Sequence, residues 1–296
     1  MHTTPLLSIV IPTHKRPAIL RQCLDHLGRQ TIAEQIEVIV VNDADEWKVE
    51  SGKWKVDLKI FNIPQCHQGT ARNYGVQQAS GKFVMFIGDD IFLAPDACEK
   101  HLTILNSQFS ILNSTAVLGF TTWDPACVIT PVMRWLERSG WQFGYPMISR
   151  FAHQIIPSSI QHKFTYTSHI SLPTKIAKKF PFREDVTLYG WEDIEWGWRL
   201  KEAGVKLFYE PDAKALHHHH MTMEDSLKRM ETLGRSAVVM EKLLSKDEAA
   251  FRRMEELAAG VVPRGWKRFK YQIALLLPGM RGAHARAFLC GIDGNR

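Results

Sequence analysis

Two neighbouring carboxylates stand where an apolar segment of the sequence ends. Asp89 and Asp90 follow the run Phe83 to Ile87, and Gly88 lies between the end of that run and the two acids. Adjacent acidic side chains repel each other, so a strand end that carries both usually has a cation or a hydroxyl-rich ligand as its partner. A solvated turn in which Asp90 caps a helix is the alternative. The pair therefore predicts either a ligand site or an ordinary turn.

A second acidic pair, Glu192 and Asp193, follows Trp191 and opens a segment that we expect to be helical as far as Gly204. The dipole of a helix favours acidic side chains at its N-terminus and keeps Asp193 ionised at neutral pH. A general base must be ionised before it can accept a proton. A capping role and a catalytic role for Asp193 are therefore compatible.

Four consecutive histidines, His217 to His220, form a third candidate site. In an extended segment alternate side chains face opposite ways, so we expect His217 and His219 to point inward and His218 and His220 to face water. Clustered imidazoles favour metal binding, whether functional or adventitious. The sequence has no glycine-rich phosphate loop, and a metal ion is the natural substitute for one.

The elements that must position these residues alternate between strand and helix in the first half of the chain. Such alternation predicts a parallel sheet covered by helices, with ligands bound at the carboxyl ends of the strands. Thr13, Asp43 and Asp89 all fall at such ends. The expected strands are Leu7 to Ile11, Glu37 to Val41, Leu58 to Phe61 and Phe83 to Ile87, and the expected helices are Ala18 to Gln30 and Gly69 to Ala79.

The second half of the chain is less regular. Residues 115–168 are rich in Trp and Pro and show no clean period, which predicts irregular loops with a helix at Pro131 to Ser139. Strands are expected at Tyr166 to Leu172 and at Lys206 to Tyr209. Apolar residues then recur at spacings of three and four from Leu227 to Leu244, which predicts a long helix.

Net charge is concentrated at one end of the 296 residues. The 37 basic and 31 acidic residues give +6, but seven of the basic residues and one acidic residue follow position 263, so the first 263 residues balance 30 against 30. A neutral body argues against nucleic-acid binding over the whole surface. No apolar run reaches the roughly 18 to 20 residues of a membrane span, and no signal peptide is apparent. With five scattered cysteines, we expect a cytoplasmic protein.

Five ordered segments together make the chain resemble a family 2 glycosyltransferase with the GT-A fold, from about Leu7 to His220. The segments are Ser8-Ile9-Val10-Ile11-Pro12-Thr13, Val38-Ile39-Val40-Val41-Asn42-Asp43, Gly69-Thr70-Ala71-Arg72-Asn73-Tyr74-Gly75, Gly88-Asp89-Asp90, and Trp191-Glu192-Asp193 with Arg199. The resemblance implies an α/β fold, Rossmann-like, with a mainly parallel central sheet flanked by helices. It places the catalytic domain at residues 1–222, followed by a helical C-terminal region at residues 223–296 that is basic from residue 264.

The resemblance also assigns roles to single residues. Asp193 would be the catalytic base and Glu192 would orient a substrate. Trp191 would either stack on the sugar of the acceptor or pack against the core. Asp90 and His217 would hold Mn²⁺ or Mg²⁺, and His169 stands where an asparagine near the donor sugar is expected. The residues that would bind the nucleotide sugar are Pro12, Thr13, His14, Asp43, Arg72 and Asp89.

These roles imply an inverting, metal-dependent enzyme that transfers one sugar from a nucleotide sugar, with UDP as the expected nucleotide. The acceptor would be a surface glycan or a lipid-linked saccharide, as in polysaccharide biosynthesis. The alternative is a non-catalytic nucleotide-binding or glycan-binding module with the same fold. A basic aromatic segment, Trp266 to Leu277, would form a helix that lies on an anionic membrane, at its inner face, or packs on the catalytic domain.

Overall fold

A computed structural model gives the fold and describes residues 4–44, 54–107, 114–245, 273 and 278–294. A nine-stranded sheet in the described part of the chain has the order β3-β2-β1-β4-β8-β6-β9-β5, with β7 paired to β9. Its strands are β1 (Leu7–Thr13), β2 (Ile36–Asn42), β3 (Asp57–Asn62), β4 (Phe83–Ile87), β5 (Ile91–Leu93), β6 (Thr115–Trp123), β7 (Gln154–Ile155), β8 (His169–Pro173) and β9 (Lys206–His217).

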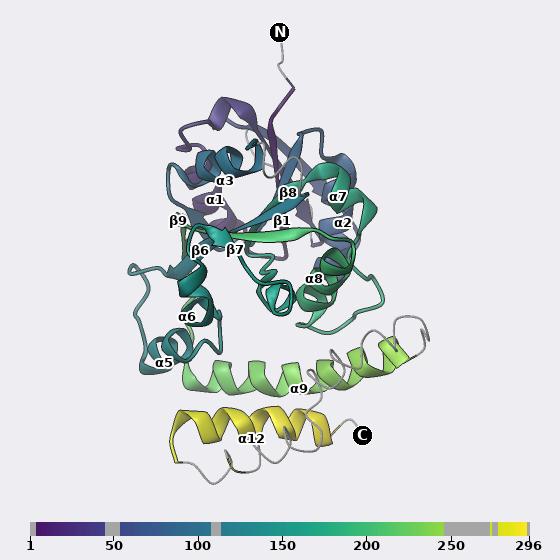
Figure 1. Ribbon diagram of the computed structural model, residues 1–296. Helices are drawn as coiled ribbons and strands as arrows, with labels where there is room; N and C mark the ends of the chain where they lie inside the picture. The colour runs from purple at the N-terminus through teal and green to yellow at the C-terminus, as the bar shows by residue number, and fades with distance from the viewer. Residues whose placement is uncertain (1–3, 45–53, 108–113, 246–272, 274–277, 295–296) are drawn as a thin grey trace.

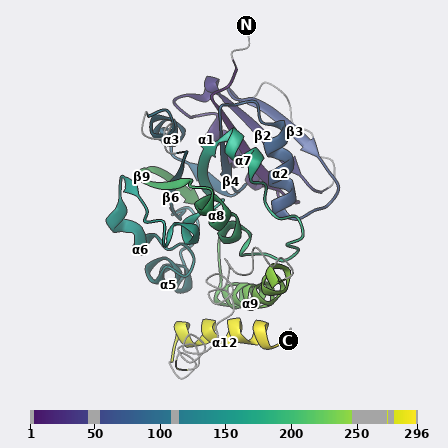
Figure 2. The ribbon, with the colours of Figure 1, turned by 45° about the vertical axis from the view of Figure 1, so that its right-hand side comes forward.

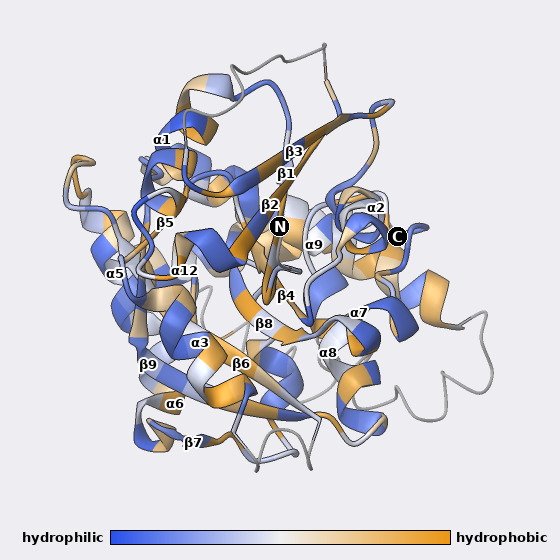
Figure 3. Ribbon diagram, turned by 90° about the horizontal axis from the view of Figure 1, so that it is seen from above, coloured by the Kyte–Doolittle hydropathy of each residue, from blue (hydrophilic) through white to orange (hydrophobic). Residues whose placement is uncertain are grey.

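The first four strands form the parallel sheet that the alternating sequence predicted. Strand β1 lies between β2 and β4 and is parallel to both. Its side chains alternate between two cores: Ile9 and Ile11 pack on the side of α1 (Pro17–Leu27), and Val10 packs on the side of α2 (Gln68–Gln78). The strands are coloured as largely hydrophobic in Figure 3, whereas the covering helices carry both colours, as expected for amphipathic helices.

The other half of the sheet adds antiparallel pairs. Strand β8 is antiparallel to β4 and to β6, and β6 is parallel to β9 with a register shift after Gly119. The sheet is thus mixed rather than parallel throughout. The prediction of irregular structure from residue 115 was wrong for β6, which is buried on both faces and therefore lacks a period of two. Strand β9 also extends to His217, well beyond the expected end at Tyr209.

Helices cover both faces of the sheet, as Figures 1 and 2 show. Helix α5 confirms the helix predicted at Pro131 to Ser139, and α9 confirms the long one expected beyond residue 222. The remaining helices are α3 (Ala97–Leu105), α5 (Pro131–Ser139), α6 (Tyr145–Ile148), α7 (Thr174–Lys179), α8 (Glu192–Glu202), α9 (Met223–Ser245) and α12 (Met280–Asp293), with single 3₁₀ turns at Ala33–Gln35, Ser149–Phe151 and Gln161–Phe164.

The two C-terminal helices lie side by side beneath the sheet in Figure 1. They approach closely at two glycines: a Cβ on Gly234 would lie 2.1 Å from the carbonyl oxygen of Phe288, and one on Gly291 would lie 2.0 Å from that of Glu231. Most of the segment expected as a basic helix, Trp266 to Leu277, lies outside the described residues. Within the described ranges, none of the helices combines the length and apolar character that crossing a membrane requires.

Candidate functional site

Four strand ends meet at one edge of the sheet and bring the candidate residues together. Because β1, β2 and β4 are parallel, the residues that follow them, Asp43 and Asp89 among them, share that edge with Thr13. Strand β9 belongs to the other half of the sheet, and its pairing with β5 sets Ile91 opposite His217. This register brings the histidine cluster beside Asp90.

Arg16 lies between the two carboxylates that follow β4. Its Nη1 donates to Asp90 Oδ2 at 2.9 Å and its Nε donates to Asp89 Oδ2 at 3.2 Å, while Nη2 pairs with Asp89 Oδ1. Thr13 Oγ1 also donates to Asp89 Oδ2, at 2.6 Å. The Asp89 and Asp90 side chains are buried and that of Arg16 is 44% exposed. The cation beside the acidic pair is thus a partly exposed side chain of the protein itself.

The two acids differ in how readily they ionise. Burial raises the pKa of Asp89 to about 6, even though Arg16 opposes the rise. Burial also acts on Asp90, but hydrogen bonding and charge from His217, together with Arg16, outweigh it and hold the pKa of Asp90 well below its usual range. Asp90 is therefore the carboxylate that stays ionised and available to a cation.

Asp90, His217 and His219 fit a divalent cation. The Nε2 atom of His217 lies 3.6 Å from Asp90 Oδ2, and Nδ1 of His219 lies 3.9 Å from the same oxygen. All three ligand atoms lie within 4.8 Å of one another. The His217 ring stacks between Trp123 and His219, and its buried Nδ1 has no hydrogen-bond partner among the described residues. One carboxylate with two imidazoles suits Mn²⁺ better than Mg²⁺.

A cavity of about 350 Å³ opens between the ends of β1 and β2, and Pro12, Thr13, His14 and Asp43 line it. His14 Nδ1 lies 2.8 Å from Asp43 Oδ1, and the backbone N–H of Cys66 donates to Asp43 Oδ2 at 3.2 Å. These two contacts fix the Asp43 carboxylate at the wall, where it can accept a hydrogen bond from a bound base.

Arg72, on α2, is buried and lines a second, larger cavity that shares Gln68 and Glu192 with the first. Its Nη2 donates to Gln68 Oε1 at 3.1 Å, while its Nε and Nη1 have no hydrogen-bond partner among the described residues. Glu192 Oε1 lies 3.7 Å from Arg72 Nη1 and accepts from Gln68 Nε2 at 2.7 Å. Burial lowers the pKa of Arg72 despite the nearby acids. Unsatisfied buried donors of this kind are poised for an anionic ligand.

Asp193 lies at the start of α8, where Trp191 adopts φ of 73° and turns the chain into the helix. Its Oδ1 accepts from the N–H of Ile194 at 2.8 Å. Burial, reinforced by the negative charge of Glu192, raises the pKa of Asp193 above its ordinary value. Asp90, His217 and Asp193 line the same cavity of about 690 Å³, so a potential base and a potential metal site share one space.

Trp191 connects this cavity to the C-terminal helices. Its indole N–H donates to the carbonyl oxygen of Leu233 on α9 at 2.9 Å, and its ring lies 6.4 Å from that of Phe288 on α12. Leu233, with Arg229 and Thr232, also lines the cavity. The C-terminal region therefore forms a wall of the site.

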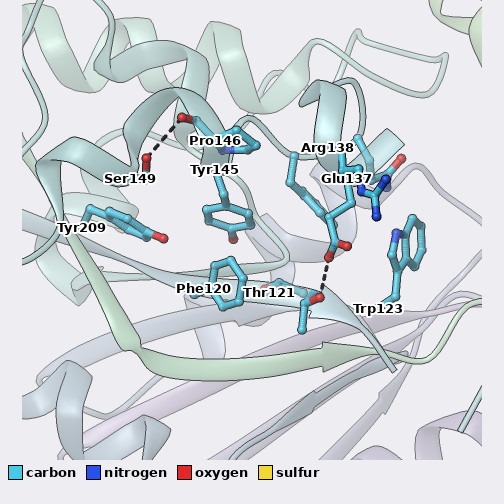
Figure 4. A pocket seen from close by; sticks show the side chains of 12 residues that line it. Phe120, Thr121, Trp123, Glu137, Arg138, Tyr145, Pro146, Ser149 and Tyr209 are labelled. Carbon is cyan, nitrogen blue, oxygen red and sulfur yellow. Dashed lines mark hydrogen bonds between the residues drawn. The ribbon is translucent and has the colours of Figure 1, made fainter. Parts of the chain in front are cut away.

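An aromatic pocket of about 330 Å³ adjoins the large cavity and shares Gln142 and Phe143 with it. Figure 4 shows Phe120, Tyr145 and Tyr209 on one side of the pocket, facing Trp123 and Glu137 on the other. The wall between the two spaces is thin, because the rings of Trp123 and Phe143 lie 5.1 Å and 5.9 Å from that of His217.

Comparison with known proteins relates part of this chain to a family. Residues 8–125 match the sequence model described as Glycosyl transferase family 2. Over that segment the chain is similar to members of glycosyltransferase family 2. A putative glycosyltransferase, EpsH, of Bacillus subtilis (strain 168) is 34% identical over 37% of this chain and 33% of its own length. Validoxylamine A glucosyltransferase of Streptomyces hygroscopicus subsp. jinggangensis is 29% identical over 69% of this chain and 53% of its own. The chain thus spans a third to a half of the length of these relatives.

Solved structures establish the GT-A fold. The mannosyltransferase PcManGT from Pyrobaculum calidifontis, in complex with GDP-Man and Mn²⁺, has a TM-score of 0.60 at 14% identity, over 99% of this chain and 87% of its own. S. aureus TarS 1-349, in complex with UDP-GlcNAc, has a TM-score of 0.52 at 15% identity, over 98% of this chain and 89% of its own. The fold class expected from the sequence is confirmed.

All the site residues predicted from the sequence line the two cavities between β1 and α8. The expectation for His169 was wrong: its ring is fully buried and lies between His101 and Gly119, where a Cβ would collide with it, and burial lowers its pKa to about 4. His218 was also wrongly placed, because it contacts Asp124 rather than water alone. Arg16 and Gln68 had no predicted role, because nothing in the sequence spacing shows that their side chains contact the acids.

Proposed function

We propose that the chain is an inverting glycosyltransferase that moves one sugar from a nucleotide sugar, with UDP as the expected nucleotide, to a hydroxyl group of a glycan or lipid-linked saccharide. The observation that carries the proposal is that Asp90, with its two histidines, and Asp193 line one cavity. Such an arrangement can stabilise a leaving diphosphate and deprotonate an acceptor in the same space.

The donor would lie across the two cavities. Its base would reach Asp43, its ribose hydroxyls would donate to Asp89, and its diphosphate would lie near Arg72 and Asp90. A divalent cation held by Asp90, His217 and His219 would offset the negative charge that develops on the departing diphosphate. Arg16, half exposed and flexible, would move from the carboxylates to the phosphates when the donor arrives.

Asp193 would take the proton of the acceptor hydroxyl while that oxygen bonds to the anomeric carbon. The bond from the anomeric carbon to the diphosphate oxygen breaks on the opposite face, so the configuration inverts. A raised pKa makes Asp193 a stronger base than an ordinary carboxylate. Glu192, fixed by Gln68, would orient a sugar hydroxyl at the same wall.

The acceptor would extend into the aromatic pocket beyond Phe143. Aromatic faces can pack against the apolar faces of sugar rings, while Glu137 and Arg138 supply polar contacts at the rim. The continuity of the two spaces through Gln142 and Phe143 supports this path.

A donor screen followed by a hydrolysis assay tests the proposal. We expect one class of nucleotide sugar, from a panel of UDP-sugars and GDP-sugars, to raise the melting temperature, and Mn²⁺ to enlarge the rise. Asp193→Asn should keep donor binding and reduce turnover of that donor by a factor on the order of 10² to 10⁴. Equal slow hydrolysis by both proteins would favour the alternative, a non-catalytic binding module.

A further inference from the structure

A second group of metal-ligating side chains lies beside the catalytic cluster and has no part in the proposed reaction. Asp124, Cys127 and His218 place their ligand atoms within 4.8 Å of one another. His218 Nδ1 is 2.7 Å from Asp124 Oδ2 and 3.6 Å from Cys127 Sγ. The Asp124 side chain is buried and the other two are partly exposed, so an ion from solvent can reach them.

Two separate segments of the chain hold these three side chains. Asp124 and Cys127 belong to a turn after β6, closed by the Cys127 N–H, which donates to Asp124 O at 3.0 Å. His218 follows β9; its backbone N–H donates to Asp90 O at 2.8 Å, and its ring stacks on Phe92 with centroids 5.0 Å apart. The donor atoms are therefore positioned before any ion binds, which lowers the conformational cost of binding.

We propose that Asp124, Cys127 and His218 bind Zn²⁺. In a tetrahedral zinc site the metal–ligand distances set a nitrogen–sulfur separation of about 3.6 Å and a nitrogen–oxygen separation of about 3.3 Å. The Cys127 to His218 separation of 3.6 Å already has this value. The Asp124 to His218 pair, now hydrogen-bonded at 2.7 Å, has to open by only about half an ångström to admit the ion.

The donor set separates this site from the one at Asp90. A thiolate ligand selects a softer ion such as Zn²⁺, whereas the carboxylate and imidazoles at Asp90 accept Mn²⁺. When zinc binds, the Cys127 thiol releases its proton to solvent as the sulfur coordinates. His218 exchanges the Nδ1 proton that it shares with Asp124 for one on Nε2, so that the Nδ1 lone pair can bond to zinc in place of the hydrogen bond. Water completes the fourth position, because three protein ligands leave it open.

Zinc at this position would fix the connection between β6 and α5. The turn at Asp124 to Cys127 leads into α5, whose residues Glu137 and Arg138 line the aromatic pocket. Coordination would tie this turn to the end of β9, next to His217. The site is therefore expected to stabilise the acceptor side of the molecule, and it does not depend on the proposed reaction being correct.

Cobalt provides a direct spectroscopic test on the full chain, because a Co²⁺–thiolate bond gives a near-ultraviolet charge-transfer band. We expect one equivalent of this band in the wild-type protein, its loss in Cys127→Ala, and its displacement by Zn²⁺. Cys290→Ala, at an exposed cysteine on α12, is the matched control and should keep the band. Asp90→Ala should also keep it, because that carboxylate belongs to the other cluster.

Absence of the band from the wild-type protein, or its persistence in Cys127→Ala, would overturn the proposal. If Cys127→Ala fails to fold, alkylation of the wild-type protein replaces it: Zn²⁺ should slow the modification of Cys127 at least tenfold and leave that of Cys290 unchanged, as followed by mass spectrometry. Equal modification rates of Cys127 with and without Zn²⁺ would show that Asp124 and His218 form only a hydrogen-bonded pair.

Discussion

At the scale of single residues, the Arg16 guanidinium supplies the positive charge beside Asp89 and Asp90. It forms ion pairs with both Asp89 and Asp90 while remaining 44% exposed. In the proposed donor complex, Arg16 and the metal ion would compete for Asp90. We therefore expect Arg16 to give way to an external cation when the donor binds.

The variant Arg16→Ala tests whether the Arg16 guanidinium and a metal ion compete for Asp90. Two buried carboxylates would lose their partner, so we expect the free energy of unfolding in EDTA to fall by about 1 to 3 kcal/mol. Mn²⁺ should then raise the melting temperature more in the variant than in the wild type, because no side chain competes for Asp90. Arg21→Ala, at an exposed position on α1, is the control. An equal Mn²⁺ effect in wild type and Arg16→Ala would contradict this account.

The acid side of the pH profile should report on Asp193. A base whose pKa is raised loses activity as the pH falls through that pKa, so the acid limb of kcat should lie above the value of about 4 typical of an exposed aspartate. Burial is the main cause and the charge of Glu192 adds to it. Glu192→Gln removes that charge and should move the limb to lower pH.

The matched control for this shift is Glu202→Gln, at the far end of α8 and exposed. It should leave the limb in place. If Glu192→Gln leaves the acid limb of kcat in place or moves it to higher pH, Asp193 is not the group that titrates.

At the scale of elements, the sequence predicted the ends of the first strands better than the whole sheet. The carboxyl ends of β1, β2 and β4 could be located because each strand is a short apolar run that stops at polar residues. Strand β6 could not be located, because it is buried on both faces and so lacks alternation, and because it contains Gly119, a residue type depleted in strands. His169 was misplaced for a related reason: its partners His101 and Gly119 are distant in sequence.

The aromatic pocket beside β6 gives a prediction for the acceptor. Ser149→Trp would fill the pocket from its exposed rim, so we expect a higher KM for the acceptor and unchanged binding of the donor. Ser139→Trp, exposed on α5 and outside the pocket lining, is the control. A KM that responds equally to both changes would remove the pocket from the acceptor path.

The packing of α9 on α12 gives a second prediction at this scale. Gly234→Ala would bring a methyl group against the backbone carbonyl of Phe288, which cannot move like a flexible side chain. We expect a loss of about 1 to 3 kcal/mol in the free energy of unfolding by chemical denaturation. Gly294→Ala, at the end of α12, should cost much less. If both variants lose the same free energy of unfolding, the close packing of α9 on α12 is not the reason that position 234 requires glycine.

At the scale of the whole molecule, the C-terminal helices are part of the site. The sequence predicted a boundary at residue 222, with a catalytic domain before it and a helical region after it. Yet Arg229, Thr232 and Leu233 of α9 line the large cavity, and Trp191 donates a hydrogen bond to α9. Sequence periodicity could predict the helix but not its partner. Truncation at residue 222 would therefore open the cavity as well as shorten the chain.

We propose that a nucleoside diphosphate and a divalent cation bind together at Asp90. Calorimetric titration of UDP into the full chain, with Mn²⁺ and with EDTA, measures this coupling most directly. We expect Mn²⁺ to tighten UDP binding in the wild type by at least tenfold and to have little effect in Asp90→Ala. Equal UDP affinity with and without Mn²⁺ in the wild type, or an unchanged Mn²⁺ effect in Asp90→Ala, would contradict the claim.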